Sequence, residues 1–187
     1  MSLRLPTQSA PSHSRHWRSI LYSCCHPFSH PSHFLFYETI TSALSSLPYL
    51  GYADGASHYS RHLASAAWAI FTPLHTLVLA NGVCIGTATN NQAEYDAFHG
   101  LLVDALSHRI LHLHVHLDSL LVVLQLNGVY RVHNPLLFRQ YLRVKILIRE
   151  FRFITFHHIP RDQIHYVDQI ANHILDWYLS HTQHNNI

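Results

Sequence analysis

Hydrophobic and polar residues follow two different periods in the middle of this chain. Residues 110–117, ILHLHVHL, alternate at every second position, which is typical of a β-strand. Residues 89–107 instead repeat apolar side chains every three or four positions, which predicts a helix with one buried face. Thr89 and Gln92 have the spacing of a capping box, so we expect this helix to begin there.

The same reading extends from about residue 48 to the end of the chain. The turn pairs Asn127-Gly128 and Asn134-Pro135 separate the later elements. The predicted strands cover 49–53, 65–71, 76–86, 110–117 and 151–159. The predicted helices cover 89–107, 119–126, 134–150 and 165–179. Three strands followed by alternating helices and strands predict an α/β domain, in which a mixed sheet carries helices on its faces.

Composition divides the chain into parts. Residues 1–33 are rich in Ser, Pro and His, and all six glycines follow residue 50. We therefore predict a low-complexity, disordered or loosely packed segment over 1–47, one folded domain over 48–180, and a short tail over 181–187. A hydrophobic fraction of 48% suffices for a core, whereas a net charge of +2 is too small to indicate any partner.

The chain contains no apolar run of the roughly 18 residues that a membrane span needs, so we expect no membrane partner. Cys24, Cys25 and Cys84 form no spaced framework, which suits a reducing, intracellular compartment, nuclear or cytoplasmic. Three arginines and no acids in residues 1–33 leave organellar targeting open. We expect a monomer.

Acidic residues are scarce, and four of the ten have informative positions. Asp54 and Asp118 follow predicted strands, Glu94 lies on the apolar stripe of the helix at 89–107, and Asp168 lies on the inward side of the last helix. Each alone suits a surface or helix-dipole role. Together they would bring four negative charges to one region, which costs several kcal/mol unless cations neutralise them. Oxygen ligands of this kind suit Mg²⁺ or Mn²⁺.

Four blocks of sequence carry a family resemblance. They are DGAS at 54–57, TNNQAEYDAFHGLLVDAL at 89–106, DSLLVVLQLNGVYRVHNP at 118–135 and HHIPRDQIHYVDQIAN at 157–172. In order and spacing they resemble type 1 ribonuclease H, most closely the RNase H domains of plant retrotransposon polyproteins. The resemblance implies a ribonuclease H-like fold, whose mixed five-stranded sheet has three antiparallel strands, then two parallel ones, with helices on both faces.

The resemblance also implies an activity. Asp54, Glu94, Asp118 and Asp168 match the four carboxylates with which the family binds two Mg²⁺ ions, for which Mn²⁺ is a possible substitute. These ions cleave the RNA strand of an RNA/DNA hybrid by in-line displacement. The partner expected for this chain is therefore an RNA/DNA hybrid.

Three departures from the family pattern concern activity more than fold. LASAAWAIF at 63–71 lacks the usual glycines, Leu117 replaces a small residue, and Ile164 replaces an asparagine. They leave open an alternative, in which the domain is a catalytically weak or inactive, nucleic-acid-binding remnant of a retrotransposon.

Basic residues cluster in 131–152, where six cations face one acid, Glu150. Such a cluster suits either a solvated helix face or phosphate contact with a hybrid, which would make binding salt-dependent. The residues we expect to contact nucleic acid are Asn90, Asn91, Gln92, Arg131, Arg139, Arg143 and Arg161.

Histidine is unusually frequent, with 20 residues. His112, His114 and His116 point to the same side of their predicted strand, and neighbours two apart could chelate Zn²⁺. A His-rich metal-binding protein is therefore a further alternative. In relatives of ribonuclease H a loop histidine often assists product release, and the candidates near Asp168 are His157, His158 and His165.

Overall fold

The structure is a computed structural model that describes residues 47–182. Its strands are β1 (Tyr49–His58), β2 (Leu63–Phe71), β3 (Leu77–Gly86), β4 (His112–Leu117) and β5 (Phe153–His158). Its α-helices are α3 (Asn90–Ser107), α4 (Leu120–Leu126), α5 (Pro135–Ile148) and α6 (His165–Thr182). Two short 3-10 helices, η1 (Tyr59–Arg61) and η2 (Arg161–Gln163), join strands and helices. The predicted segments 1–47 and 181–187 lie outside the described part except for Leu47, His181 and Thr182. Their two boundaries therefore stay predictions.

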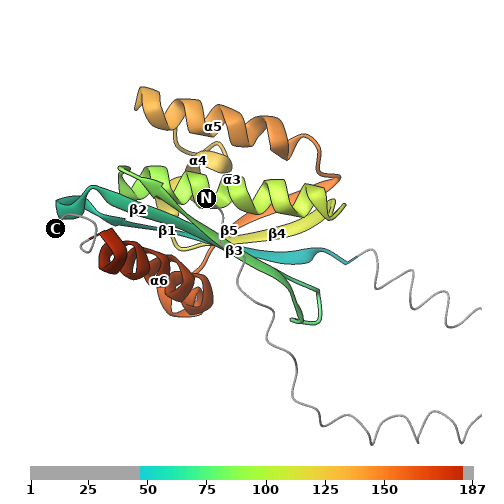
Figure 1. Cartoon of the computed structure of the whole chain (residues 1–187). Helices are drawn as coiled ribbons and strands as arrows, with labels where there is room; N and C mark the ends of the chain where they lie inside the picture. Colours follow the sequence, from blue (N-terminus) through green and yellow to red (C-terminus); the bar gives the residue numbers. More distant parts are fainter. Residues whose placement is uncertain (1–46, 183–187) are drawn as a thin grey trace, which may run out of the picture. The chain divides into compact units, whose positions relative to one another are not determined.

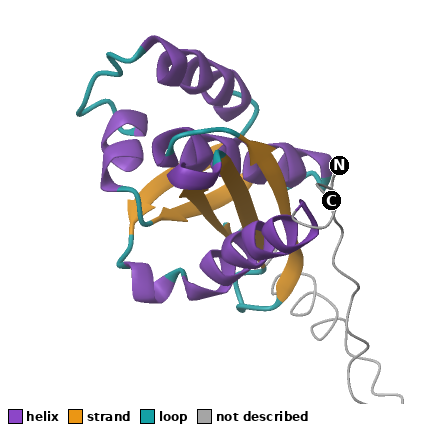
Figure 2. Cartoon of the chain, turned by 60° about the vertical axis from the view of Figure 1, so that its left-hand side comes forward, coloured by secondary structure: helices purple, strands orange, loops and turns teal. Residues whose placement is uncertain are grey.

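The five strands form one sheet in the order β3-β2-β1-β4-β5. β1, β2 and β3 pair antiparallel, whereas β4 lies parallel to β1 and β5 lies parallel to β4. Helices α3, α4 and α5 lie on one side of the sheet and α6 lies on the other (Figures 1 and 2). The predicted fold class is therefore confirmed, including its antiparallel and parallel parts. None of the described helices is long and apolar enough to span a bilayer.

Strand β2 is rich in alanine, and helices pack on both of its faces. Ala66 belongs to the core beneath α3, and Ala67 and Ala69 belong to the core beneath α6. The absence of glycine from LASAAWAIF, which departs from the family pattern, is therefore compensated by buried alanines. Leu117, another departure, is 1% exposed and packs in the α3 core.

Strand β1 is longer than predicted, and this corrects the expectation that it ends before DGAS. Asp54 pairs with Ala67 and Gly55 with Ala66, so the hairpin ladder continues to His58. Gly55 also lets helix α3 approach β1: a Cβ at this position would lie 2.3 Å from the backbone of Ala93 and of Glu94. Asp54 consequently lies within the strand, opposite the N-terminal half of α3.

Helix α3 is fixed at both ends. At its start the predicted capping box is present, because the Thr89 side chain accepts from the Gln92 N–H and the Gln92 side chain accepts from the Thr89 N–H. Near its end, Asp104 Oδ2 accepts hydrogen bonds from Trp68 Nε1 at 2.7 Å and from Asn81 Nδ2 at 2.6 Å. These contacts hold α3 against β2 and β3.

Candidate metal and active site

Three carboxylates from three elements converge beside the centre of the sheet. Asp54 comes from β1, Glu94 from α3, and Asp118 from the residue after β4. One oxygen of each lies within 4.8 Å of the other two. The convergence follows from the fold, since β4 runs parallel beside β1 and Gly55 admits α3. Among the described residues this is the only group of three or more acids, histidines or cysteines with such spacing.

Each of the three carboxylates has one buried oxygen without a hydrogen-bond donor. Asp54 is 2% exposed and Glu94 is 4% exposed. Asp54 Oδ2, Glu94 Oε2 and Asp118 Oδ1 are all buried and accept no hydrogen bond. Buried polar groups are nearly always paired, so three adjacent exceptions indicate that a partner of another kind belongs here. Oxygen atoms with free lone pairs and negative charge fit a hard divalent cation.

Burial and mutual repulsion disfavour the charged forms of these acids. Burial, followed by the charges of Asp54 and Asp118, raises the pKa of Glu94 to about 9. Burial, followed by the charges of Asp118 and Asp168, raises the pKa of Asp54 to about 7. Burial also raises the pKa of Asp118. A bound cation would reverse this preference, because it stabilises the ionised carboxylates.

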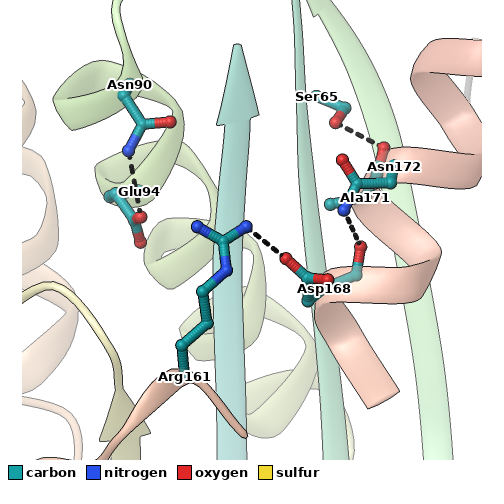
Figure 3. A network of polar contacts seen from close by, with 7 residues as sticks. All are labelled: Ser65, Asn90, Glu94, Arg161, Asp168, Ala171 and Asn172. Atoms are coloured by element: carbon teal, nitrogen blue, oxygen red, sulfur yellow. Dashed lines mark hydrogen bonds and ion pairs between the residues drawn. The ribbon is translucent and has the colours of Figure 1, made fainter. Parts of the chain in front are cut away.

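Asp168 does not join the group of three in this structure, so its place in the predicted quartet stays a prediction. Its Oδ1 instead accepts a hydrogen bond from Arg161 Nη2 at 2.5 Å, and the two form an ion pair (Figure 3). Arg161 stands on η2, just before α6, and its guanidinium reaches across to the first turns of that helix. Asp168 remains close enough for its charge to raise the pKa of Asp54 and Asp118. The sequence placed Asp168 on the correct face but did not reveal that a cation would engage it.

The residues expected to contact nucleic acid have varied surroundings. Asn90 Nδ2 donates to Glu94 Oε1 at 3.5 Å, so Asn90 helps to hold the carboxylate (Figure 3). The side chain of Gln92 is engaged in the capping box. Arg131 and Arg139 are exposed, and Arg143 Nη2 lies 3.5 Å from His99 Nε2 on α3. Arg161 pairs with Asp168, and Asn91 is half-buried.

The histidines of β4 engage one another and their neighbours. His114 Nδ1 and His157 Nε2 both contact Thr155 Oγ1, at 2.6 and 2.7 Å, and His116 stacks between Tyr52 and His157. The described part contains no three-ligand group of histidines, so the Zn²⁺ hypothesis gains no support. Of the candidate loop histidines, His158 contacts the backbone of one of the acids, since its Nε2 donates to the Asp118 carbonyl at 3.1 Å.

Sequence comparison places the chain among known proteins. A family model described as reverse transcriptase-like matches residues 52–174. Ribonuclease HI of Halobacterium salinarum is 35% identical over 125 residues, which cover 67% of this chain and 63% of that protein. A bifunctional protein of Mycobacterium tuberculosis, Rv2228c, is 36% identical over 125 residues, 66% of this chain and 34% of its own length. The chain thus spans about a third of the mycobacterial relative.

Solved structures agree with the sequence matches. RNase H1 from H. salinarum has a TM-score of 0.67 at 34% identity, over 69% of this chain and 98% of that one. The N-terminal RNase H domain of Rv2228c has a TM-score of 0.70 at 32% identity, over 73% and 99%. LC11-RNase H1, solved with an RNA/DNA hybrid, has a TM-score of 0.67 at 27% identity, over 70% and 99%.

Sheet order, helix placement and the three converging acids define a domain of the ribonuclease H-like fold, similar to type 1 ribonucleases H. The match over residues 52–174 shows further that the chain belongs to the reverse transcriptase-like family.

Proposed function

We propose that this chain is an endoribonuclease that cleaves the RNA strand of an RNA/DNA hybrid with the help of two Mg²⁺ ions. The observation that carries the proposal is the group of three carboxylates that bring one oxygen each within 4.8 Å of the other two, while each has a buried oxygen without a donor. The similarity to ribonuclease HI of H. salinarum and to LC11-RNase H1, which was solved with a hybrid, supports the choice of substrate.

In this proposal Asp54, Glu94 and Asp118 hold the metal, and Asp168 joins them when it leaves Arg161. Bound ions of this kind lower the pKa of an attacking water and stabilise the leaving oxygen. The chain's own residues position the ligands. Gly55 allows Glu94 to reach Asp54, and Asn90 fixes one oxygen of Glu94.

The hybrid itself would be bound through its phosphates. Arg131, Arg139 and Arg143 are exposed on α5 and the segment before it, and α5 packs against α3, which carries Glu94. Arginine side chains contact phosphates well because the guanidinium offers several donors in one plane. Binding that depends on such contacts weakens steeply with added salt.

A cleavage assay tests the proposal. The purified chain is given a hybrid labelled on its RNA strand, in Mg²⁺ and separately in Mn²⁺, beside Asp118→Asn and the matched control Asp176→Asn, whose parent residue is exposed on α6. We expect the wild type and the control to cleave the RNA strand, and Asp118→Asn to bind the hybrid without cleaving it.

Hybrid binding without cleavage by the wild type, in either metal, would instead favour a second candidate, an inactive nucleic-acid-binding remnant of a retrotransposon. The ion pair between Arg161 and Asp168 is the observation in favour of this candidate, because it withdraws one of the four expected ligands.

A further inference from the structure

Helix α5 exposes large apolar side chains to solvent. Leu136, Phe138, Leu142 and Ile146 are 57%, 44%, 46% and 61% exposed, although Leu137 and Val144 on the opposite side are buried. Helix α5 packs on α3 and lies farther from the sheet than α3 does, with its outer side turned away (Figure 1). A cluster of exposed apolar residues on one element marks an interaction surface more often than chance exposure does.

The spacing of these residues indicates what kind of partner fits. Phe138, Leu142 and Ile146 follow one another at intervals of four and form a narrow ridge along the helix, which we call the α5 ridge. Ridges of this spacing pack into the grooves between side chains of a second helix. A narrow ridge fits a helix better than a lipid surface, which requires a broad apolar face.

Positive charge borders the α5 ridge. Arg139 lies about 60° around the helix from Leu142 on one side, and Lys145 lies about 60° from it on the other. Arg149 stands at the C-terminal cap, and the segment 131–152 holds six cations against Glu150. A partner that covers the ridge must therefore bring acids along both of its edges.

The α5 ridge is separate from the side of α5 that contacts α3. Gln140 Nε2 donates to the Gln92 carbonyl, and Arg143 contacts His99, so these two residues face α3. Leu142 lies on nearly the opposite side of the helix from Gln140, about 160° away. A partner on the ridge therefore need not displace α3 or the three carboxylates.

We propose that the α5 ridge is a docking surface for an acidic amphipathic helix of another protein. A second copy of this chain fits poorly, because two such ridges would bring Arg139 and Lys145 of one copy against the cations of the other. The chain's own residues 1–46 also fit poorly, since Glu38 is their only acid. The proposal does not depend on hybrid cleavage.

The test uses the full chain and a fluorescein-labelled synthetic helical peptide, with leucines along one face and glutamates on both flanks. Binding is followed by fluorescence anisotropy against a scrambled peptide of the same composition. We expect the patterned peptide to bind, and Leu142→Glu to weaken its binding by about tenfold or more, since one buried anchor contributes at least that much. The matched control is Leu74→Glu, whose parent leucine is 72% exposed in the turn between β2 and β3 and should leave binding unchanged.

A charge exchange sharpens the test. The double variant Arg139→Glu, Lys145→Glu should lose the acidic peptide and bind a version with lysines in place of the glutamates. Circular dichroism melts should show that these exposed substitutions leave the fold intact. The proposal is overturned if the scrambled peptide binds equally well, or if Leu142→Glu has no effect. It is also overturned if vesicles containing phosphatidylserine bind in the peptide's place, or if the chain dimerises through Leu142.

Discussion

Helix α3 carries a carboxylate near each end, and the two have opposite surroundings. Asp104 Oδ2, near the C-terminal end, accepts two short hydrogen bonds, from Trp68 and Asn81. Glu94, near the N-terminal end, is more deeply buried, yet its Oε2 accepts none. The neighbours of Asp104 are neutral donors, whereas those of Glu94 include two further acids, Asp54 and Asp118.

Asp104 therefore stabilises the folded state, whereas Glu94 lowers its stability. Asp104 joins α3 to β2 and β3, so its removal leaves donors without a partner. Glu94 contributes nothing comparable, and the rise of its pKa to about 9 means that its ionised form opposes folding. A buried carboxylate oxygen without a donor is thus a better sign of function than the burial of an acid as such.

The largest expected effect comes from Glu94→Gln. We expect hybrid cleavage to fall by about a thousandfold or more, because the amide lacks the negative charge of the carboxylate and offers one ligand oxygen instead of two. The free energy of unfolding without metal should stay the same or rise, because glutamine removes the cost of keeping a buried acid protonated at a pH where the unfolded chain would release the proton. Cleavage rates and urea unfolding measure the two effects, with Glu150→Gln, at an exposed position, as the control. A variant that loses as much stability as a core mutant would contradict the assignment.

The next effect is the pH dependence of stability. Folded Asp54 and Glu94 keep their protons to about pH 7 and 9, whereas in the unfolded chain they ionise near 3.8 and 4.5. The folded state therefore binds more protons between these values, so stability without metal falls as the pH rises through this window. We expect a loss of several kcal/mol between pH 5 and 9, since a tenfold difference in acidity between the folded and unfolded chain corresponds to about 1.4 kcal/mol.

Magnesium should reduce that loss, because an ion that binds only the folded state stabilises it. Urea unfolding at several pH values, with Mg²⁺ or with a chelator, measures both dependences. Glu94→Gln is the necessary reference because it removes only the contribution of Glu94, and its curve should be flatter than that of the wild type. Equal slopes for the two proteins would show that Glu94 is ionised throughout.

How far these features could be predicted depends on whether local sequence determines them. The alternation at His112–Leu117 and the capping box at Thr89 are local signals, and the structure confirms both. The length of β1 is not local: DGAS has the composition of a turn, but Gly55 and Ala56 are held in the ladder by Ala66 and Ser65.

In the candidate site, too, some features follow from local sequence and others depend on distant parts of the chain. Helical register and strand ends placed Glu94 and Asp118 near Asp54, since these positions follow from the order of the elements. The partner of Asp168 could not be predicted in this way, because the reach of Arg161 depends on the conformation of η2 and on the first turns of α6. The proximity of Arg161 and Asp168 in sequence was the only available signal.

At the other end of α3, we expect Asp104→Ala to lower the free energy of unfolding by about 2 kcal/mol, because Trp68 Nε1 and Asn81 Nδ2 lose their acceptor. Asp104→Asn should cost less than about 1 kcal/mol, since its amide oxygen can accept both hydrogen bonds. Both variants should keep wild-type cleavage per folded molecule, as measured by urea unfolding beside the hybrid assay. If a folded Asp104→Asn variant lost cleavage, Asp104 would not be purely structural, and its contrast with Glu94 would be wrong.

Arg161→Ala should have the smallest effect on stability, but it tests cation binding at the site directly. The Arg161 side chain is 69% exposed, so breaking its pair with Asp168 should change the free energy of unfolding by less than about 1 kcal/mol. Its loss frees Asp168 as a ligand and removes a positive charge that opposes the negative field at Asp54 and Asp118. Both consequences favour cation binding, so thermal unfolding should show half-maximal stabilisation at a lower Mg²⁺ concentration than in the wild type.

The Mg²⁺ concentration for Arg161→Lys should lie between those of the wild type and Arg161→Ala, because the shorter ammonium keeps the charge but lacks the planar fork of donors. Weaker Mg²⁺ binding by Arg161→Ala would mean that the guanidinium orients Asp168 toward the metal. Asp168 would then be a metal ligand in the structure as it stands, like Glu94.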